Sequence, residues 1–140
     1  MHMPVYVAGL GCRKGCSAPE LLELLQAALA QSGLAMSELV CLATSEHKQT
    51  EAGLLILTDQ IGLTLATLSV AELDGYDARL EQRSALSLSI TGSAGVAEAS
   101  ALAQAERLGG RPARLLCSKI RSANATCAIA VSPLAPEENA

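Results

Sequence analysis

The sequence predicts an α/β protein, a three-layer α/β/α sandwich around a mostly parallel mixed sheet. Short apolar segments alternate along the chain with segments that have apolar residues at helical spacing. Such alternation produces right-handed crossovers and parallel strands that helices cover on both faces. The last two apolar segments have no helix between them, so we expect the last strand to run antiparallel. The 140 residues are the length of one ordinary domain, which we place over residues 1–140.

The first strand is predicted over Val5–Gly9, because this stretch is short and apolar and ends at a glycine. The helix that follows has a capping box of Ser17 and Glu20 and a proline, Pro19, in its first turn. It is expected to end at Gly33, because glycine adopts the left-handed conformation that closes many helices. The first unit of the chain is therefore predicted to be a strand, a glycine-rich loop and a helix.

The next elements repeat this order. We expect a second strand over Leu39–Ala43, a polar loop with the sequence TSEHKQT, and a helix from Glu51 to about Gly62. A third strand is predicted over Leu63–Leu68, and a capping box at Ser69 predicts a short helix after it.

The last third of the chain contains the remaining elements. A fourth strand is predicted over Leu86–Ile90 and a helix over Val96–Leu108. The two final strands are expected at Leu115–Cys117 and Ala125–Val131. Residues 133–140 are rich in proline and acidic side chains, which indicates a flexible tail.

Composition indicates a soluble cytoplasmic protein. Hydrophobic residues make up 50% of the chain, but no apolar run reaches the roughly 18 residues that span a bilayer, so we expect no membrane contact. The amino terminus shows no export signal, and residues 1–3 read as a cloning remnant or a frayed start. Five cysteines without C-x-x-C spacing indicate reduced thiols.

The charge pattern argues against nucleic acid as a partner and for a smaller anion. The net charge is -4 and only 1% of the residues are aromatic, so the chain repels nucleic acid overall and lacks stacking platforms. Several basic residues nevertheless follow predicted strands, at the edge where open α/β sheets bind ligands. They are Arg13, Lys14, Lys48, Lys119 and Arg121. This clustering predicts a polyanionic ligand that is carboxylated or phosphorylated.

The candidate ligand-binding residues lie at the ends of the predicted strands and in the turns after them. They are Gly11, Cys12, Arg13, Lys14, Gly15, Thr44, Lys48, Gly92, Ser93, Glu98, Lys119 and Arg121. A lone glycine-rich turn is a weak signal for a dinucleotide, and no acidic residue ends the second strand to hold a ribose. A nucleotide phosphate is therefore kept as a third, lesser alternative.

The candidate catalytic residues are His47, Lys48 and Glu51. The His47 imidazole is the general-base candidate, and Lys48 could stabilise a developing oxyanion. Their alternative interpretations are a solvated loop histidine and, for Glu51 and Glu98, carboxylates that favour a helix amino terminus whatever the function. The sequence leaves open whether the protein is an enzyme.

Two cysteines lie in the first glycine-rich turn. Cys12 and Cys16 have no histidine or further cysteine nearby, so we expect no metal site. They are interpreted as small side chains that fill the turn. A second possibility is a lowered pKa and some reactivity for Cys12, because Arg13 and Lys14 are adjacent to it.

Four motifs occur in a fixed order between about Val5 and about Val131: GLGCRKG, ATSEHKQTEAGL, TGSAGVAEASAL and SKIRSANATCAIA. Together they resemble the CobE family and the C-terminal domain of CbiG, proteins of cobalamin (vitamin B12) biosynthesis. The resemblance implies an α/β/α fold that acts on corrin intermediates with many carboxylates. It assigns family motif positions to Gly11, Cys12, Arg13, Gly15, Lys48, Glu51, Gly92, Val96, Glu98, Lys119 and Thr126.

The resemblance implies a carrier or accessory protein that binds a corrin-pathway intermediate, such as a precorrin or hydrogenobyrinic acid. Other cobalamin-biosynthesis enzymes are then possible partners, and no cofactor is expected. The alternative is a hydrolase that acts on a lactone-bearing corrin precursor, as CbiG-like proteins do. The chain has only the unit that resembles their C-terminal domain, so that activity does not carry over directly.

Overall fold

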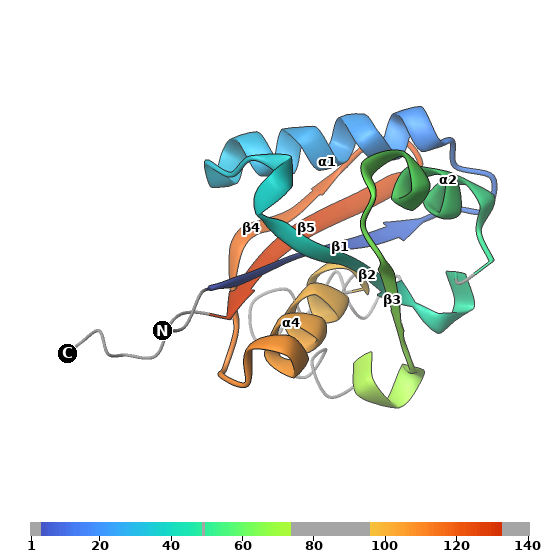
Figure 1. Ribbon diagram of the computed structural model, residues 1–140. Helices are drawn as coiled ribbons and strands as arrows, with labels where there is room; N and C mark the ends of the chain where they lie inside the picture. Colours follow the sequence, from blue (N-terminus) through green and yellow to red (C-terminus); the bar gives the residue numbers. More distant parts are fainter. Residues whose placement is uncertain (1–3, 49, 74–95, 133–140) are drawn as a thin grey trace.

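The computed structural model describes residues 4–48, 50–73 and 96–132. In these residues a central sheet is covered by α1 and α2 on one face and by α4 on the other, which confirms the predicted three layers (Figure 1). The predicted strand Leu86–Ile90 and the predicted tail at residues 133–140 lie outside the described residues.

The boundaries of the elements follow the predicted order. The strands are β1 (Val5–Cys12), β2 (Leu39–Ser45), β3 (Leu65–Leu68), β4 (Arg114–Arg121) and β5 (Ala125–Ser132). The helices are α1 (Ala18–Ser32), α2 (Ala52–Ile61) and α4 (Val96–Gly109), with single 3₁₀ turns at Met36–Glu38 and Glu46–Lys48.

The strand order in the described sheet is β3-β2-β1-β5-β4. β1 pairs in parallel with β2, and β2 in parallel with β3. β5 runs antiparallel to both of its neighbours, β1 and β4, so the other described strands share one direction. The antiparallel last strand is confirmed, and its position between β1 and β4 makes it central in the sheet.

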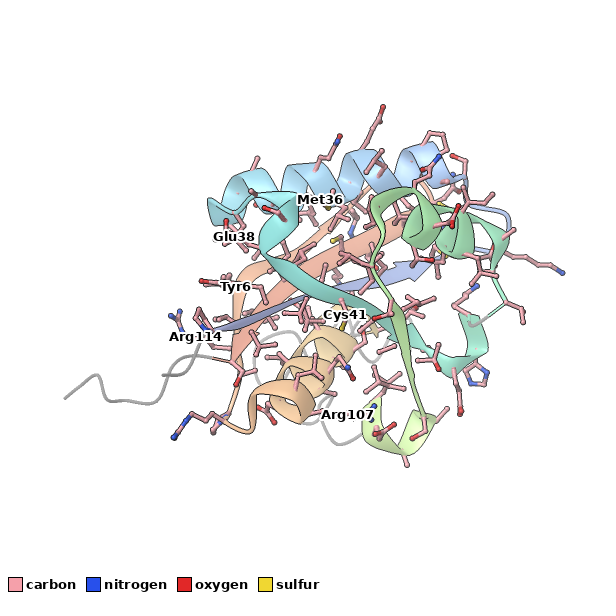
Figure 2. All side chains as sticks on the ribbon, viewed as in Figure 1. Tyr6, Met36, Glu38, Cys41, Arg107 and Arg114 are labelled. Atoms are coloured by element: carbon pink, nitrogen blue, oxygen red, sulfur yellow. The ribbon has the colours of Figure 1, made fainter. Side chains whose placement is uncertain are left out.

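The helix ends show how local sequence fixes these elements. The hydroxyl of Ser17 accepts a hydrogen bond from the Glu20 amide at 3.3 Å, as an N-cap does, and Gly33 ends α1 with φ of 72°. The predicted box at Ser69 is complete, because the Ser69 amide donates to the Glu72 carboxylate and the Glu72 amide donates to the Ser69 hydroxyl. An ion pair then joins Glu72 to Arg107 near the end of α4 (Figure 2).

Two hydrophobic clusters fill the spaces above and below the sheet. Alternate residues of β1 point to opposite faces, so Ala8 and Leu10 pack with α1 and α2 while Val7 packs with α4. The α4 side of the core consists mainly of alanines, and the α1 side of larger leucines. Small side chains allow α4 to approach the sheet closely.

The closest approach is at Gly9 in β1. A Cβ atom added there would lie 1.9 Å from the Ala97 carbonyl oxygen and 2.8 Å from the Ala101 amide nitrogen. The buried hydroxyl of Ser100 donates to the Ala97 carbonyl at 3.2 Å on the same turn of α4. The backbones of β1 and α4 are therefore in direct contact, and only glycine fits.

Three strands are longer than predicted, which corrects the placement of five candidate residues. Gly11 and Cys12 end β1, Thr44 is in β2, and Lys119 and Arg121 are in β4 rather than in loops. The prediction stopped where the apolar run stopped, but backbone pairing continues past that point. The β1 pairing with β5, for example, runs on to the pair of Cys12 and Ala125.

Replacing Gly9 by alanine is expected to lower the free energy of unfolding by about 1–3 kcal/mol, because the added methyl overpacks a backbone contact. Urea denaturation measures the change. Gly33→Ala is the matched control, since it adds the same methyl where nothing lies within 4 Å and only the positive φ opposes it. A Gly9 variant as stable as the wild type would contradict the close contact.

Candidate functional site

A cavity of about 640 Å³ opens beyond the carboxyl ends of β1, β2 and β4. The start of α4 and the turn between β4 and β5 also line it. Its lining residues are Gly11, Cys12, Arg13, Ser45, His47, Lys48, Val96, Lys119, Arg121, Ser122, Ala123, Asn124, Ala125 and Thr126.

Sheet pairing places the basic residues of distant segments together. Arg121 of β4 pairs with Thr126 of β5, which pairs with Gly11 of β1, so these residues form one row across the sheet at the cavity. Arg13 follows the end of β1, and Lys119 precedes Arg121 on β4. All of them line the cavity.

Four of the five predicted basic residues thus lie in the cavity lining, namely Arg13, Lys48, Lys119 and Arg121. His47 lines the cavity too and is exposed. Lys14 is exposed in the adjoining loop and is outside the lining. Because cationic groups converge here from three segments of an acidic chain, the cavity is suited to an anion.

The glycine-rich loop after β1 is fixed at both ends. The Arg13 amide donates to the Asn124 carbonyl at 2.8 Å, and the Gly15 amide donates to the Glu51 carboxylate at 2.8 Å. Gly15 has φ of 86°, a conformation that favours glycine, and the Cys16 amide closes the turn on the Arg13 carbonyl at 3.1 Å. Arg13 is therefore presented from a defined backbone.

The Glu51 carboxylate stabilises this loop from the amino terminus of α2. One oxygen accepts from the Gly15 amide and the other lies 4.0 Å from the Lys48 ammonium, with 11% of the Glu51 side chain exposed. Glu51 does not line the cavity. A catalytic role for it stays a prediction, and its observed contacts are those of a loop brace that also orients Lys48.

The Glu98 carboxylate has a similar role on the opposite side of the cavity. From the first turn of α4 it accepts a hydrogen bond from the Lys119 amide at 3.1 Å. Burial lowers the pKa of the Lys119 ammonium; the Glu98 carboxylate opposes the shift and Arg121 adds to it. The contact ties the amino terminus of α4 to β4.

Glu20 is a residue that the sequence analysis interpreted differently. Its side chain does not complete the predicted capping box at Ser17. It accepts from the Ser122 hydroxyl, from the Asn124 amide at 2.8 Å and from the Asn124 side-chain amide at 3.0 Å. These donors lower the pKa of the Glu20 carboxyl, because each stabilises the ionised form. The contact spans a hundred positions, so no local pattern could reveal it.

The turn itself, Ser122–Asn124, was absent from the predicted site. It joins two strands, and its Ser-Ala-Asn sequence is typical of a turn. This turn sequence could have indicated that the turn follows Arg121. Its position at the cavity could not be predicted, because it depends on the pairing of β5 with β1.

The predicted residue Thr44 lies beneath the cavity. It is fully buried, and its hydroxyl donates to the Leu10 carbonyl at 2.6 Å, which joins β2 to β1. Its neighbour Ser45 lines the cavity and accepts from the His47 amide at 3.1 Å. The predicted residues Gly92 and Ser93 lie outside the described part of the chain.

The suggestion of an activated Cys12 thiol is wrong. Burial raises the pKa of Cys12 above its ordinary value of 9.0; Lys48 opposes this shift, and the carboxylates of Glu51 and Glu20 add to it. Burial likewise raises the pKa of Cys16 to about 11. The sequence analysis counted the adjacent cations and could not anticipate the burial.

Residues 4–48, 50–73 and 96–132 contain no group of three or more His, Cys, Asp or Glu side chains that could hold a metal ion. In the same ranges no helix is long and apolar enough to cross a membrane.

The family model of the cobalamin synthesis G C-terminus matches residues 6–130, which is most of the chain. The chain belongs to this family. The match includes the cavity and every described helix and strand except the ends of β1 and β5.

Relatives and solved structures agree with the family. Protein CobE of a Sinorhizobium species is 36% identical over 124 residues, a match that covers 89% of this chain and 78% of that protein. A crystal structure of CobE, from the cobalamin biosynthetic pathway, has a TM-score of 0.81 and 42% identity, and the match covers 91% of this chain and 90% of the other. The cobalamin biosynthesis protein chiG from Agrobacterium tumefaciens has a TM-score of 0.68 and 35% identity over 90% of this chain and 97% of its own.

A more distant relative is an enzyme. The cobalt-precorrin-5A hydrolase of Priestia megaterium is 30% identical over 129 residues, which are 92% of this chain but 33% of the hydrolase. This chain therefore spans about a third of that enzyme. Together, the family and the CobE relatives show that this protein takes part in cobalamin biosynthesis.

The Cys12 thiol is expected to react slowly with iodoacetamide at neutral pH, because a raised pKa leaves less of the reactive thiolate. The alkylation rate of Cys12 should increase only when the pH rises above 9.0, the ordinary pKa of the thiol. Mass spectrometry of the alkylated protein follows the rate, with Cys12→Ser as the variant that identifies the site. Faster reaction than free cysteine at neutral pH would contradict the assignment.

Proposed function

We propose that this protein binds a polycarboxylate corrin intermediate of cobalamin biosynthesis and acts as a carrier or accessory protein. The observation that carries the proposal is the cavity beyond the strand ends, with Arg13, Lys48, Lys119 and Arg121 in its lining. A corrin macrocycle with carboxylate side chains around its edge presents charges that such a set can bind at several points.

The chemistry of the lining supports recognition of carboxylates. The two arginines have planar guanidinium groups that can donate two parallel hydrogen bonds to one carboxylate, while the lysines supply point charges. The net charge of the chain is -4, so the attraction of an anion to the cavity depends on the cations gathered in its lining.

The cavity also offers apolar contact. Val96, Ala123 and Ala125 lie in the lining among the charged residues. A ligand with an apolar ring system and an anionic periphery needs both kinds of surface. An isolated phosphate would use only the charges, so the mixed lining favours a larger ligand with an apolar part over an isolated phosphate.

The carboxylates around the cavity favour binding over catalysis. Glu20, Glu51 and Glu98 each accept a hydrogen bond from a backbone amide of the surrounding loops and strands. Carboxylates used in this way hold the walls together and are poorly placed to take a proton from a substrate. The arrangement therefore supports a binding site more directly than an active site.

An absorbance titration with hydrogenobyrinic acid tests the proposal. We expect a saturable spectral change that weakens as salt is added, because charge interactions are screened. Arg13→Ala should weaken binding roughly ten- to hundredfold, since a hydrogen bond to a charged group contributes about 1.5–3 kcal/mol.

Arg114→Ala is the matched control for the titration. Arg114 is exposed at the start of β4, and it pairs with Val131, which pairs with Tyr6 near the start of β1 (Figure 2). It therefore lies at the edge of the sheet opposite the cavity. Equal losses in the Arg13 and Arg114 variants would indicate a general charge effect and would count against the proposed site.

A hydrolase acting on a lactone-bearing corrin precursor is the second candidate function. It is favoured by the position of His47, exposed in the cavity lining beside Lys48, and by the similarity to a cobalt-precorrin-5A hydrolase. In this case Lys48 would stabilise the oxyanion that forms when His47 activates water.

The hydrolase hypothesis predicts turnover by the purified chain, followed by chromatography of the corrin products. His47→Ala should then abolish turnover and leave binding of the precursor nearly unchanged. Wild-type protein that binds corrins without forming a new product would exclude this function and leave the carrier role.

A further inference from the structure

The side chain of Glu20 makes the most extensive described contact with the wall of the cavity, although it does not line the cavity itself. It reaches from the first turn of α1 to the turn between β4 and β5. There it accepts from the hydroxyl of Ser122 and from both the backbone and the side-chain amide of Asn124. A carboxylate has only acceptors, and these donors match it.

This contact continues to Arg13 through one further hydrogen bond. The Asn124 residue that Glu20 holds by its amide also offers its carbonyl to the Arg13 amide at 2.8 Å. The order is therefore Glu20, then Asn124, then Arg13. Ser122, Asn124 and Arg13 all line the cavity, so the same contacts fix two of its walls relative to each other.

The opposite end of the loop has an independent anchor. Gly15 donates to Glu51 of the α2 amino terminus, so loss of Glu20 is expected to loosen the Arg13 end of the loop and to leave the Gly15 end in place. Arg13 stands between these two anchors. Its backbone is the part of the loop that depends on Glu20.

We propose that Glu20 is a positioning residue for ligand recognition, which holds the Ser122–Asn124 turn and, through it, Arg13 in the arrangement that binds a polycarboxylate. The inference rests on the proposed function of the cavity. A loop that is already ordered loses less conformational entropy when the ligand binds, so positioning increases affinity without any direct contact.

Simple electrostatics and a positioning role predict opposite effects on ligand binding when Glu20 is replaced, so an experiment can separate them. Glu20 is an anion close to a cationic cavity, so its removal alone should strengthen the binding of an anionic ligand. Positioning predicts weaker binding when Glu20 is replaced. The direction of the change therefore separates the two effects.

The experiment is a double-mutant cycle with hydrogenobyrinic acid as the probe, followed by absorbance. Glu20→Ala should weaken binding roughly three- to tenfold, the scale expected when a side chain must be ordered on binding. In an Arg13→Ala background the same change should have little further effect, because Glu20 acts through Arg13. Glu23→Ala on the exposed face of α1 is the control that removes the same charge without touching the turn.

A second variant covers the case in which Glu20→Ala does not fold. Asn124→Ala removes the side-chain donor to Glu20 and keeps the carbonyl that binds Arg13, so it should weaken binding in the same direction. Hydrogen exchange without ligand adds an independent readout: the Arg13 amide should exchange faster in the Glu20 variant, while the Gly15 amide should not.

The possible failures are distinguishable. Unchanged or tighter binding by the Glu20 variant, or losses that add fully to those of Arg13→Ala, would overturn the positioning role while the proposed function stands. Absence of any wild-type binding would overturn the proposed function and this role in ligand recognition with it. Unchanged exchange of the Arg13 amide would show that Glu20 does not hold the loop.

Discussion

The pairing of β5 with β1 along the whole length of both strands is the constraint on which the site depends. The register runs from Val5 opposite Ser132 to Cys12 opposite Ala125 without a break. Because β5 is antiparallel, its first residues meet the last residues of β1. The turn before β5 is thereby delivered to the carboxyl edge of the parallel strands, where the glycine-rich loop begins.

The rest of the cavity follows from that placement. Arg121 lies in the same row as Gly11, with β5 between them, because both residues pair with Thr126. Three carboxylates then hold the segments of the cavity wall by hydrogen bonds. Glu20 binds the Ser122–Asn124 turn, Glu51 binds the glycine-rich loop, and Glu98 joins β4 to the start of α4. The acidic side chains bind the backbone of the walls, and Glu51 also lies 4.0 Å from the Lys48 ammonium. The basic side chains of the same walls set the charge of the lining.

Much of this could be predicted from the sequence where local chemistry decides structure. Ser17 and Gly33 bound α1 as expected, and the box of Ser69 and Glu72 is formed, because caps depend on residues within one turn. The antiparallel last strand followed from the missing helix between two apolar segments. The clustering of cations at one edge followed from the rule that strand ends of a parallel sheet share that edge.

The predictions that were wrong concern residues whose structure depends on contacts between distant segments of the chain. Glu20 was interpreted as half of a local capping box with Ser17, but its carboxylate accepts a hydrogen bond from Asn124, which is 104 residues away. Thr44 looked like a loop residue, but pairing continues past the apolar run and buries it. For Cys12, the second possibility of a pKa lowered by its neighbours is wrong, because burial raises the pKa. The clustered cations predicted a polyanion, and only the resemblance to the family suggested a corrin intermediate as that polyanion.

The proposed binding site for a corrin polycarboxylate lies at the strand ends, between the glycine loop and the Ser122–Asn124 turn. Nuclear magnetic resonance of isotopically labelled protein during a titration with hydrogenobyrinic acid tests it most directly. Binding there predicts shifts confined to the cavity lining, including the loop after β1, the turn before β5 and the side chains of Arg13, Lys48, Lys119 and Arg121, with Arg114 unchanged. Shifts centred on another face of the sheet, or none at saturating ligand, would contradict it.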